Sequence, residues 1–301
     1  MTTYATPQTL YTPSSPSGTI FAYRRFNPPS PSPSTTPLLI LTHFRGTISL
    51  FDPLLLSLLS STRPLIQVDY SGIGLSTGPL ATSIKQSADH ILQFLSLINE
   101  PKVDILGFSL GGMVAQLVAL NSPPSIHIRK LILAGTTPSA GPEIQQTPNG
   151  EGVEKYGGAK YITVENFKVL FFPETKEGGL AAEEWWERIH EGGEDSGEFV
   201  SEGYKDGGAG LMAQSEQVGK WGKKESSQGE EGSFERLGGL VDVEVLVVNG
   251  SNDYMIPTVN SFVMQQRLPN AQLIIYPKSG HGAIFQYAKQ FARDAIHFLS
   301  G

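Results

Sequence analysis

A serine between glycines, Ser109 in the stretch 107–111, has the spacing of a catalytic nucleophile. The apolar run 103–106 before it has the length of a buried strand. The apolar stretch after it has helical length and ends near Asn121, ahead of two prolines. A Gly-x-Ser-x-Gly turn between a strand and a helix holds its serine in a strained conformation and exposes the hydroxyl above the helix N-terminus. This context favours a nucleophile over the alternative, a tight turn with a solvent-facing serine.

A serine hydroxyl becomes a useful nucleophile when a base takes its proton, and histidine is the natural base near neutral pH. Among the six histidines, His281 alone follows a late strand pattern at its carboxyl end and has glycine on both sides. Four others lie in helical patterns, before a strand or in a long insertion, where surface roles are expected: His90, His127, His190 and His297. His281 is therefore the predicted base.

Asp253 is the predicted partner of His281, because it follows the strand pattern before the one that leads to the histidine. The order along the chain is then serine, aspartate, histidine. A carboxylate in this place fixes the tautomer of the histidine and stabilises the imidazolium that forms. The alternative is an Asx turn at a strand end, which the preceding Ser251 and Asn252 favour. The earlier strand pattern at 130–135 is followed by no carboxylate.

Negative charge that develops on a substrate oxygen requires donors already in place. One predicted donor is the backbone N–H of Leu110, at the start of the helix after Ser109. The other is the N–H of Phe44, in the loop after the apolar run 38–42. His43, in the same loop, comes before the serine in the chain and is expected to line the pocket.

Strand patterns alternate with helical patterns, which predicts crossover units and a parallel sheet. The expected strands are a hairpin (8–12 and 18–26) and 38–42, 65–69, 103–106, 130–135, 243–249 and 272–276; the expected helices are 53–61, 83–97, 110–121, 258–267 and 283–299. Loops at the carboxyl ends of parallel strands reach one rim, so they should bring the site residues together. In one of these loops, Asp69 is expected to tie the backbone by hydrogen bonds rather than to act in catalysis.

Residues 136–237 interrupt this alternation and are rich in glycine and glutamate. We interpret them as a lid inserted into an alpha/beta core formed by residues 1–135 and 238–301. No linker with a break in composition divides the chain into independent halves. Insertions of this length usually carry function or disorder.

The lid contains aromatic residues and glycine-rich stretches with different expected roles. Trp185 and Trp186, together with the patch 167–172, are expected to shape the substrate pocket. The glycine-rich stretches 191–208 and 219–232 are expected to be mobile loops, with a floppy solvated loop as the alternative to a functional one.

The composition indicates a globular protein. Hydrophobic residues make up 39% of the chain, and the formal net charge is -7 with a pI near 5.4. Without a basic cluster, this charge argues against nucleic acid as a partner. The absence of cysteine excludes disulfides, thiolate catalysis and cysteine-ligated metals. We expect a small-molecule substrate, no metal, no cofactor, no membrane span and, since no signal peptide is recognisable, a cytoplasmic location; the oligomeric state is left open.

Four motifs together resemble those of the alpha/beta-hydrolase superfamily. They are 107–112, similar to its nucleophile elbow; 69–76, similar to its Asp-x-x-Gly-x-Gly-x-Ser loop; 253–257, similar to its acid segment; and 280–282, similar to its histidine loop. The resemblance covers nearly the whole chain apart from the insertion, and it is strongest to small esterase-like and haloperoxidase-like members. It implies an eight-stranded, mostly parallel sheet flanked by helices, with an inserted lid after the sixth strand, and ester-type chemistry through an acyl-enzyme.

One position departs from the family pattern. The family usually has His-Gly before its first oxyanion donor, and the aligned pair here is Thr42-His43. His43 thus carries a Cβ where glycine is usual, and Arg45 follows near the predicted pocket. This difference raises the hypothesis that Arg45 holds an anionic or polar group of the substrate.

The predicted triad of Ser109, Asp253 and His281 indicates a cofactor-independent serine hydrolase that acts on a small, mostly apolar ester, lactone or thioester. The same triad would also serve carbon-carbon bond cleavage, acyl transfer or perhydrolysis, and motifs do not separate these reactions, because a fold does not set its chemistry. An alternative from another class is a ligand-binding protein that uses the pocket as a receptor.

Overall fold

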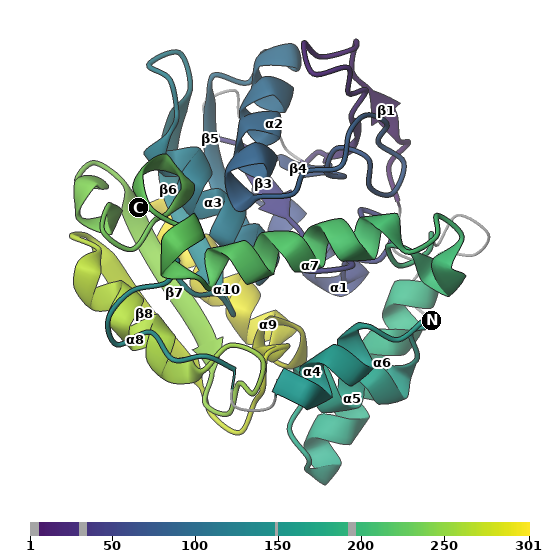
Figure 1. Cartoon of the computed structure of the whole chain (residues 1–301). Helices are drawn as coiled ribbons and strands as arrows, with labels where there is room; N and C mark the ends of the chain where they lie inside the picture. Colours follow the sequence, from purple (N-terminus) through teal and green to yellow (C-terminus); the bar gives the residue numbers. More distant parts are fainter. Residues whose placement is uncertain (1–5, 30–34, 148–149, 192–196) are drawn as a thin grey trace.

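The described residues build one sheet of eight strands, seen in the computed structural model of the chain (Figure 1). The structure describes residues 6–29, 35–147, 150–191 and 197–301. The strands are β1 Leu10–Tyr11, β2 Ala22–Phe26, β3 Leu38–Leu41, β4 Leu65–Val68, β5 Lys102–Phe108, β6 His127–Ala134, β7 Glu244–Gly250 and β8 Ala271–Tyr276. Across the sheet they lie in the order β1-β2-β4-β3-β5-β6-β7-β8. The pairs β1-β2 and β2-β4 are antiparallel and the others parallel, which confirms the predicted, mostly parallel sheet.

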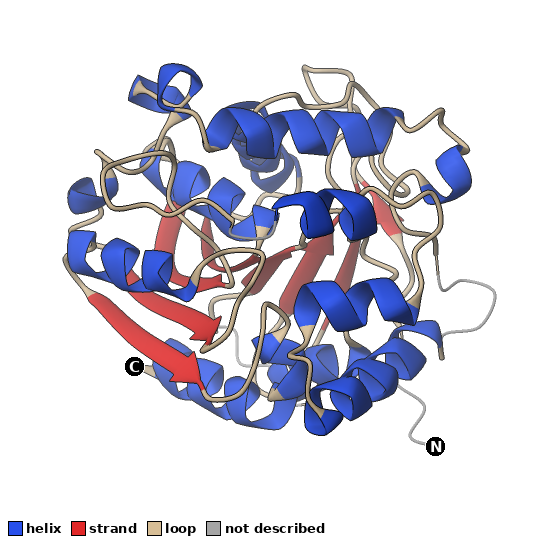
Figure 2. Cartoon of the chain, turned by 60° about the horizontal axis from the view of Figure 1, so that its bottom comes forward, coloured by secondary structure: helices blue, strands red, loops and turns tan. Residues whose placement is uncertain are grey.

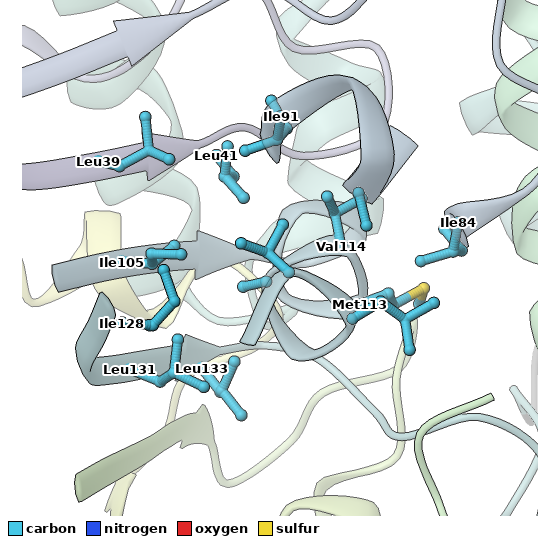
Figure 3. Close-up of a cluster of buried hydrophobic side chains, with 14 of the residues drawn as sticks. Leu39, Leu41, Ile84, Ile91, Ile105, Met113, Val114, Ile128, Leu131 and Leu133 are labelled. Carbon is cyan, nitrogen blue, oxygen red and sulfur yellow. The ribbon is translucent and has the colours of Figure 1, made fainter. Parts of the chain in front are cut away.

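Helices cover both faces of this sheet (Figure 2). On one face lie α2 (Ile84–Leu97) and α3 (Leu110–Leu120), and on the other lie α1 (Pro53–Ser60) and α10 (Ala288–Ser300). Side chains along a strand alternate between the two faces, so Leu39 of β3 packs with α2 and α3 (Figure 3), whereas Leu38 packs on the α1 side. Because both faces are covered, every residue of β3 and β4 is buried.

Side-chain caps explain where the first two helices begin. Asp52 accepts a hydrogen bond from the N–H of Leu54 at the start of α1, and Ser83 accepts one from the N–H of Gln86 at the start of α2. The remaining core helices are α8 (Thr258–Arg267), which packs against β7 and β8, and the short α9 (Ala283–Gln286). Within the described ranges, no helix combines the length and apolar character that a bilayer crossing requires.

The chain between β6 and β7 carries four further helices in its described part. They are α4 Gly150–Gly157, α5 Val164–Phe171, α6 Lys176–His190 and α7 Ala209–Trp221. Helix α6 contacts α1 and α9, and Arg188 of α6 forms an ion pair with Asp52 at the start of α1, with 2.7 Å between Nη2 and Oδ2. Helix α7 contacts α2. We call this inserted segment the cap; α6 and α7 attach it to helices of the core.

The glycine-rich parts of the cap are more regular than expected. Within 191–208, residues 192–196 lie outside the described residues, and Glu202–Tyr204 forms a turn of 3-10 helix. Within 219–232, the last turn of α7 is followed by two short 3-10 helices, Lys224–Ser226 and Gly229–Glu231. The interpretation of these stretches as loops was wrong where the chain forms helical turns. A single helical turn is too short to show hydrophobic periodicity, so the sequence does not reveal it.

The C-terminal segment forms two helices, α9 and α10, where one helix was predicted over 283–299. The break falls at Tyr287, whose φ and ψ are -108° and 33°. Its ring stacks on Tyr276 at 5.2 Å, and its hydroxyl donates to the carbonyl of Pro277 over 2.9 Å. These contacts with β8 and the following turn hold the residue out of helical geometry. A smaller correction concerns His127, which is the first residue of β6 rather than a residue before it.

Candidate active site

Ser109 lies at the sharp turn between β5 and α3. Its φ and ψ are 57° and -120°, in a region that residues other than glycine rarely adopt. The serine N–H donates to the carbonyl of Ala134 over 2.9 Å, and the hydroxyl of Thr136 donates to the serine carbonyl over 2.8 Å. A Cβ at Gly107 would collide with the backbone of Gly111, so the turn requires glycine there, as the pattern predicts.

Ser109, His281 and Asp253 form a continuous chain of hydrogen bonds. The Oγ of Ser109 lies 2.9 Å from Nε2 of His281, and the Nδ1 of His281 lies 2.8 Å from Oδ2 of Asp253. Because an ionised carboxylate only accepts, Nδ1 carries the ring proton and Nε2 can accept the proton of the serine. The three side chains come from the loops after β5, β7 and β8, and all are buried. This is the geometry by which a base activates a serine.

The second carboxylate oxygen of Asp253 is bound by the backbone. Its Oδ1 accepts hydrogen bonds from the N–H groups of Met255 and Ile256, each over 2.9 Å. The Asx turn considered as an alternative for this residue is therefore present together with the contact to His281. The turn holds the carboxylate in the one orientation that reaches the histidine.

Phe44 and Leu110, the predicted oxyanion donors, line the same cavity as Ser109. Leu110 is the first residue of α3, so its N–H has no partner within the helix. Phe44 lies in the loop after β3, and its N–H donates to none of the described residues. Two N–H groups beside a nucleophile that have no partner among the described residues suit the binding of a developing oxyanion.

A cavity of about 760 Å³ opens at Ser109, within the size range of ligand pockets. Its walls come from α4 and α7 of the cap and from the loop after β7. The lining is mainly apolar and includes Met113, Val218 and Trp221, and Glu154 is its one charged residue among those described. We call it the main cavity. In the described part of the chain, no three His, Asp or Glu side chains are grouped to hold a metal ion.

A second cavity, of about 40 Å³, also reaches Ser109. Helix α5 contributes Phe167, Leu170 and Phe171 to its wall, which are three residues of the patch expected to shape the pocket. The other lining residues are His43, Phe44, Arg45, Val153, Gly157, Ile162 and Met255. We call it the side chamber. Ser109 therefore stands where a large and a small apolar space meet.

Arg45 connects the loop after β3 to the cap, and its contact with a substrate group stays a prediction. Its Nε donates to the carbonyl of Val200 over 3.0 Å. Its Nη1 donates to the carbonyls of Gly157 and Ala159 over 3.0 and 2.6 Å. Its backbone N–H donates to Oε1 of Gln214 in α7 over 2.8 Å. The side chain is buried and these donors are directed to the cap, whereas its Nη2 has no partner among the described residues.

Replacing Arg45 with methionine should loosen the cap. Three carbonyls, two of them buried and that of Ala159 partly buried, would lose their donor at about 1 kcal/mol each, so we expect the free energy of unfolding in urea to fall by about 3 kcal/mol. The free energy of unfolding of Arg45→Lys should lie between those of Arg45→Met and the wild type, because an ammonium group offers its donors from a single point. Arg293→Met, at an exposed position of α10, is the control and should change stability by less than about 0.5 kcal/mol. Equal stability of Arg45→Met and the wild type would contradict this role.

Asp69 ties its own loop to the loop after β3, as predicted. Its Oδ1 accepts from the N–H of Ile48 over 2.8 Å, and its Oδ2 accepts from the N–H of Leu75 over 2.9 Å. Burial raises the pKa of Asp69 to about 6, although the two N–H donors stabilise the ionised carboxylate and oppose this rise. A Cβ at Gly74 would overlap the carboxylate, which explains the glycine in this loop.

His43 lies in an aromatic cluster beside the side chamber, in agreement with the prediction of a pocket residue. Its ring meets Phe108 and Phe171 edge-on at 5.5 and 5.2 Å between centroids. Its Nδ1–H donates to the carbonyl of Phe44 over 2.8 Å and so helps to orient the loop that carries this predicted donor. Burial lowers the pKa of His43 to about 4, so the ring is neutral at pH 7.

The buried His43 should make the stability of the fold fall at acid pH. Its pKa is about 4 in the folded chain and 6.5 for an ordinary histidine, so the unfolded chain binds more protons between these values. The stabilisation is complete above the ordinary pKa and is lost as pH falls towards the folded value, by about 2 kcal/mol at pH 5.

Comparison with His43→Phe isolates this effect, because the opposite contribution of Asp69 is present in both proteins. Between about pH 7.5 and pH 5, the free energy of unfolding in urea should fall by about 2 kcal/mol more in the wild type than in the variant. Parallel pH profiles of the two proteins would show that His43 titrates normally.

Trp185 and Trp186, which were expected to shape the substrate pocket, lie behind the side chamber and line neither cavity. Trp185 is fully buried, and its ring meets Phe167 edge-on at 4.7 Å and stacks on Phe285 at 5.4 Å. Trp186 stacks on Phe199 at 6.0 Å. Large aromatic rings gain most from complete burial, so here they support the wall that Phe167 presents to the chamber.

Sequence reasoning missed the cap residues that complete the site. Gln214 of α7, which binds the backbone of Arg45, lies in no motif, and neither do the cavity-lining residues Met212 and Val218 of the same helix. The only available signal was the helical length of this segment between two glycine-rich stretches. Which face of the helix would meet Ser109 depends on how the cap docks, and that is not a local property.

Comparisons with known proteins agree with this architecture. A family model described as "alpha/beta hydrolase fold" matches residues 36–287, a range that contains Ser109, Asp253 and His281. Among curated proteins, a 2-hydroxymuconate semialdehyde hydrolase of Pseudomonas putida is 26% identical over 243 residues, which cover 80% of this chain and 78% of that protein.

Two solved structures show the same arrangement over almost the whole chain. An alpha/beta hydrolase fold protein from Chitinophaga pinensis has a TM-score of 0.84 at 29% identity, covering 99% of this chain and 98% of that one. The esterase EaEST from Exiguobacterium antarcticum has a TM-score of 0.70 at 18% identity, covering 98% of this chain and 100% of its own. The second likeness concerns the fold alone.

Proposed function

The chain belongs to the alpha/beta-hydrolase fold family, and from this premise we propose that it is a serine hydrolase that cleaves small, mostly apolar esters or thioesters through an acyl-enzyme. The observation that carries the proposal is the hydrogen-bonded chain from Ser109 through His281 to Asp253, at the point where an apolar cavity begins. A nucleophile, a base with a fixed tautomer and a desolvated cavity are together what acyl transfer requires.

In the proposed reaction, the Oγ of Ser109 attacks the substrate carbonyl while Nε2 of His281 takes the serine proton. The carbonyl oxygen becomes negatively charged and accepts hydrogen bonds from the N–H groups of Phe44 and Leu110. The imidazolium of His281, held by Asp253, then protonates the leaving alcohol or thiol, and the acyl-enzyme forms. A water molecule, deprotonated by the same histidine, attacks the acyl carbon and releases the acid and the free serine.

The lining of the main cavity supports an apolar substrate without a negative charge. Among the described residues, no lysine, arginine or histidine lines this cavity, and Glu154 would repel an anion. Burying an unpaired carboxylate in such a place costs several kcal/mol. Esters or thioesters of hydrocarbon character meet no such penalty.

Labelling with a fluorophosphonate probe, followed by peptide mapping, tests the proposal. In the wild type, we expect stoichiometric labelling at Ser109, because the probe reacts with serines that a base activates. In His281→Ala, labelling should fall to a small fraction, whereas His190→Ala, an exposed histidine of the cap, should label like the wild type. Folded protein that takes up no label, or labels equally without His281, would refute the proposed mechanism.

Carbon-carbon bond cleavage is the second candidate, and the Pseudomonas putida relative favours it. The substrate in that protein's name, 2-hydroxymuconate semialdehyde, is a carboxylate without an ester bond. The same triad would have to act on a carbon chain whose carboxylate needs a cationic partner. The main cavity offers none among its described lining residues, whereas the side chamber offers Arg45, whose Nη2 has no partner among the described residues. Turnover of this compound at a rate equal to or above that of simple esters would decide for the second candidate.

A further inference from the structure

The two cavities that meet at Ser109 differ greatly in volume, and we propose that the side chamber restricts the substrate to open-chain esters or thioesters with one short group. This inference rests on the proposed function, since it concerns the two groups that flank the carbonyl attacked by Ser109. One group, on the acyl side or on the alcohol side, must fit the side chamber, and the other occupies the main cavity. A lactone, whose two sides are joined in one ring, does not divide in this way.

The volumes set the size of the short group. A site for one water-sized group requires roughly 10–15 Å³, and the side chamber has about 40 Å³. It therefore holds about three non-hydrogen atoms, such as an ethyl or propyl chain. The main cavity, of about 760 Å³, takes a far larger group. An ester with two long groups has no place for the second one.

The wall of the side chamber is closely packed and resists expansion. Phe167, Leu170 and Phe171 of α5 are all buried, and the rings of Phe167 and Phe171 lie 4.7 Å apart. Trp185, itself fully buried, meets Phe167 from behind at 4.7 Å. Displacing side chains in a core of this density sacrifices many contacts at once. The size limit is therefore a property of the folded cap rather than of one mobile side chain.

Most side chains of the wall are apolar, so the chamber admits a hydrocarbon group. Apart from Ser109, its polar side chains are His43 and Arg45. The buried ring of His43 is neutral at pH 7 and gives its Nδ1 proton to the carbonyl of Phe44. The Nε and Nη1 donors of Arg45 are bound to cap carbonyls, whereas Nη2 of Arg45 and Nε2 of His43 have no partner among the described residues. The remaining side chains of the chamber are apolar, so a short alkyl group gains contacts with them.

Two ester series test the inference by kcat/KM. The first pairs a hexyl alcohol with acids from acetic to hexanoic, and the second pairs hexanoic acid with alcohols from methyl to hexyl. In at least one series, kcat/KM should fall at least tenfold once the variable group exceeds about three non-hydrogen atoms. Hexyl hexanoate, which is long on both sides, should be the poorest substrate. Hydrolysis of hexyl hexanoate as fast as the short esters would overturn the inference.

Two variants change the chamber in opposite directions. Leu170→Ala removes three carbon atoms from the wall and should move the cut-off to longer groups by about two atoms. Gly157→Ala adds a methyl group at the border of both cavities, where its nearest neighbour would be Cε1 of Phe44 at 3.9 Å, and should move the cut-off to shorter groups. Leu180→Ala, at an exposed position of α6, is the matched control and should keep the wild-type cut-off. An unchanged cut-off in both chamber variants would refute the role of these walls.

The ester series and the labelling experiment together distinguish failure of the size limit from failure of the proposed function. Protein that labels at Ser109 and hydrolyses all esters of both series equally well retains the proposed function and loses the size limit. Protein that neither labels nor hydrolyses any ester loses the proposed function, and the inference falls with it. If Leu170→Ala folds poorly, Gly157→Ala still tests the size limit. This variant should fold, because a Cβ at this helical position lies at an ordinary van der Waals distance from its nearest neighbour.

Discussion

Replacing Ser109 with alanine should lower kcat on the best ester by roughly 10⁴-fold or more, because the covalent route disappears with the hydroxyl. Binding should change little, since the main cavity keeps all of its apolar lining. Alanine and serine both carry a Cβ, so the strained backbone of the turn costs about the same free energy in the variant as in the wild type. The fold should therefore be preserved. Single-turnover and steady-state kinetics of both proteins measure the loss.

A second serine of the same cavity provides the matched control for this experiment. Ser215 of α7 lines the main cavity and is exposed, and its side chain forms no hydrogen bond with any of the three triad residues. Ser215→Ala should therefore keep kcat within about twofold of the wild type. If Ser109→Ala retained wild-type turnover, the activity would belong to another site. If both variants lost activity equally, the cavity as a whole, rather than an activated serine, would be responsible.

Asp253→Asn should reduce kcat by about 10³- to 10⁴-fold without removing a single non-hydrogen atom from the site. The Oδ1 position of Asp253 accepts from the N–H groups of Met255 and Ile256, so the amide oxygen of asparagine has to remain there. The amide nitrogen then faces Nδ1 of His281 and donates to it. Histidine is forced into the other tautomer, with its proton on Nε2, and can no longer accept the proton of Ser109.

The stability of this variant separates a tautomer effect from misfolding. The turn keeps its two backbone hydrogen bonds, so the thermal midpoint should stay close to that of the wild type. Fluorophosphonate labelling should slow by a factor similar to that of kcat, since both depend on the same base. Asp89→Asn, a partly exposed residue of α2, should change neither quantity. A variant with normal labelling rate would show that the hydrogen bond between Asp253 and His281 does not orient the base.

Local patterns in the sequence were sufficient for the sheet, the elbow and the positions of the three triad residues. A strand followed by Gly-x-Ser-x-Gly and a helix predicts one backbone conformation, a sharp turn. This turn requires glycine at 107 and 111, because a Cβ at either position would collide with neighbouring backbone atoms. The convergence of Asp253 and His281 on Ser109 follows from parallel strands that end on one rim. The structure brings the three side chains into hydrogen-bond contact, and their catalytic roles remain a prediction that the kinetics above will test.

The contacts of the cap could not be derived in the same way. The charge of Arg45 and its place near the pocket indicate a ligand for an anion, yet its Nε and Nη1 donors reach the carbonyls of Val200, Gly157 and Ala159. These acceptors lie more than a hundred positions away in the chain, and backbone carbonyls are present in every sequence. The sequence could not place Trp185 within the cap for a related reason, since an aromatic residue in a cap suits the wall of a cavity and the layer behind it equally well.

The pairing of β6 with β7 across the whole cap has a consequence for the order in which the protein is made. Roughly a hundred residues separate the two strands, so their pairing closes a long loop and has to follow synthesis of the entire cap. Asp253 and His281 both lie beyond that point. During translation, a partly completed chain holds Ser109 but neither of the two residues predicted to activate it. We therefore expect ribosome-bound and truncated forms that lack them to be inert towards the proposed ester substrates, and activity to begin only when the final strands join the sheet.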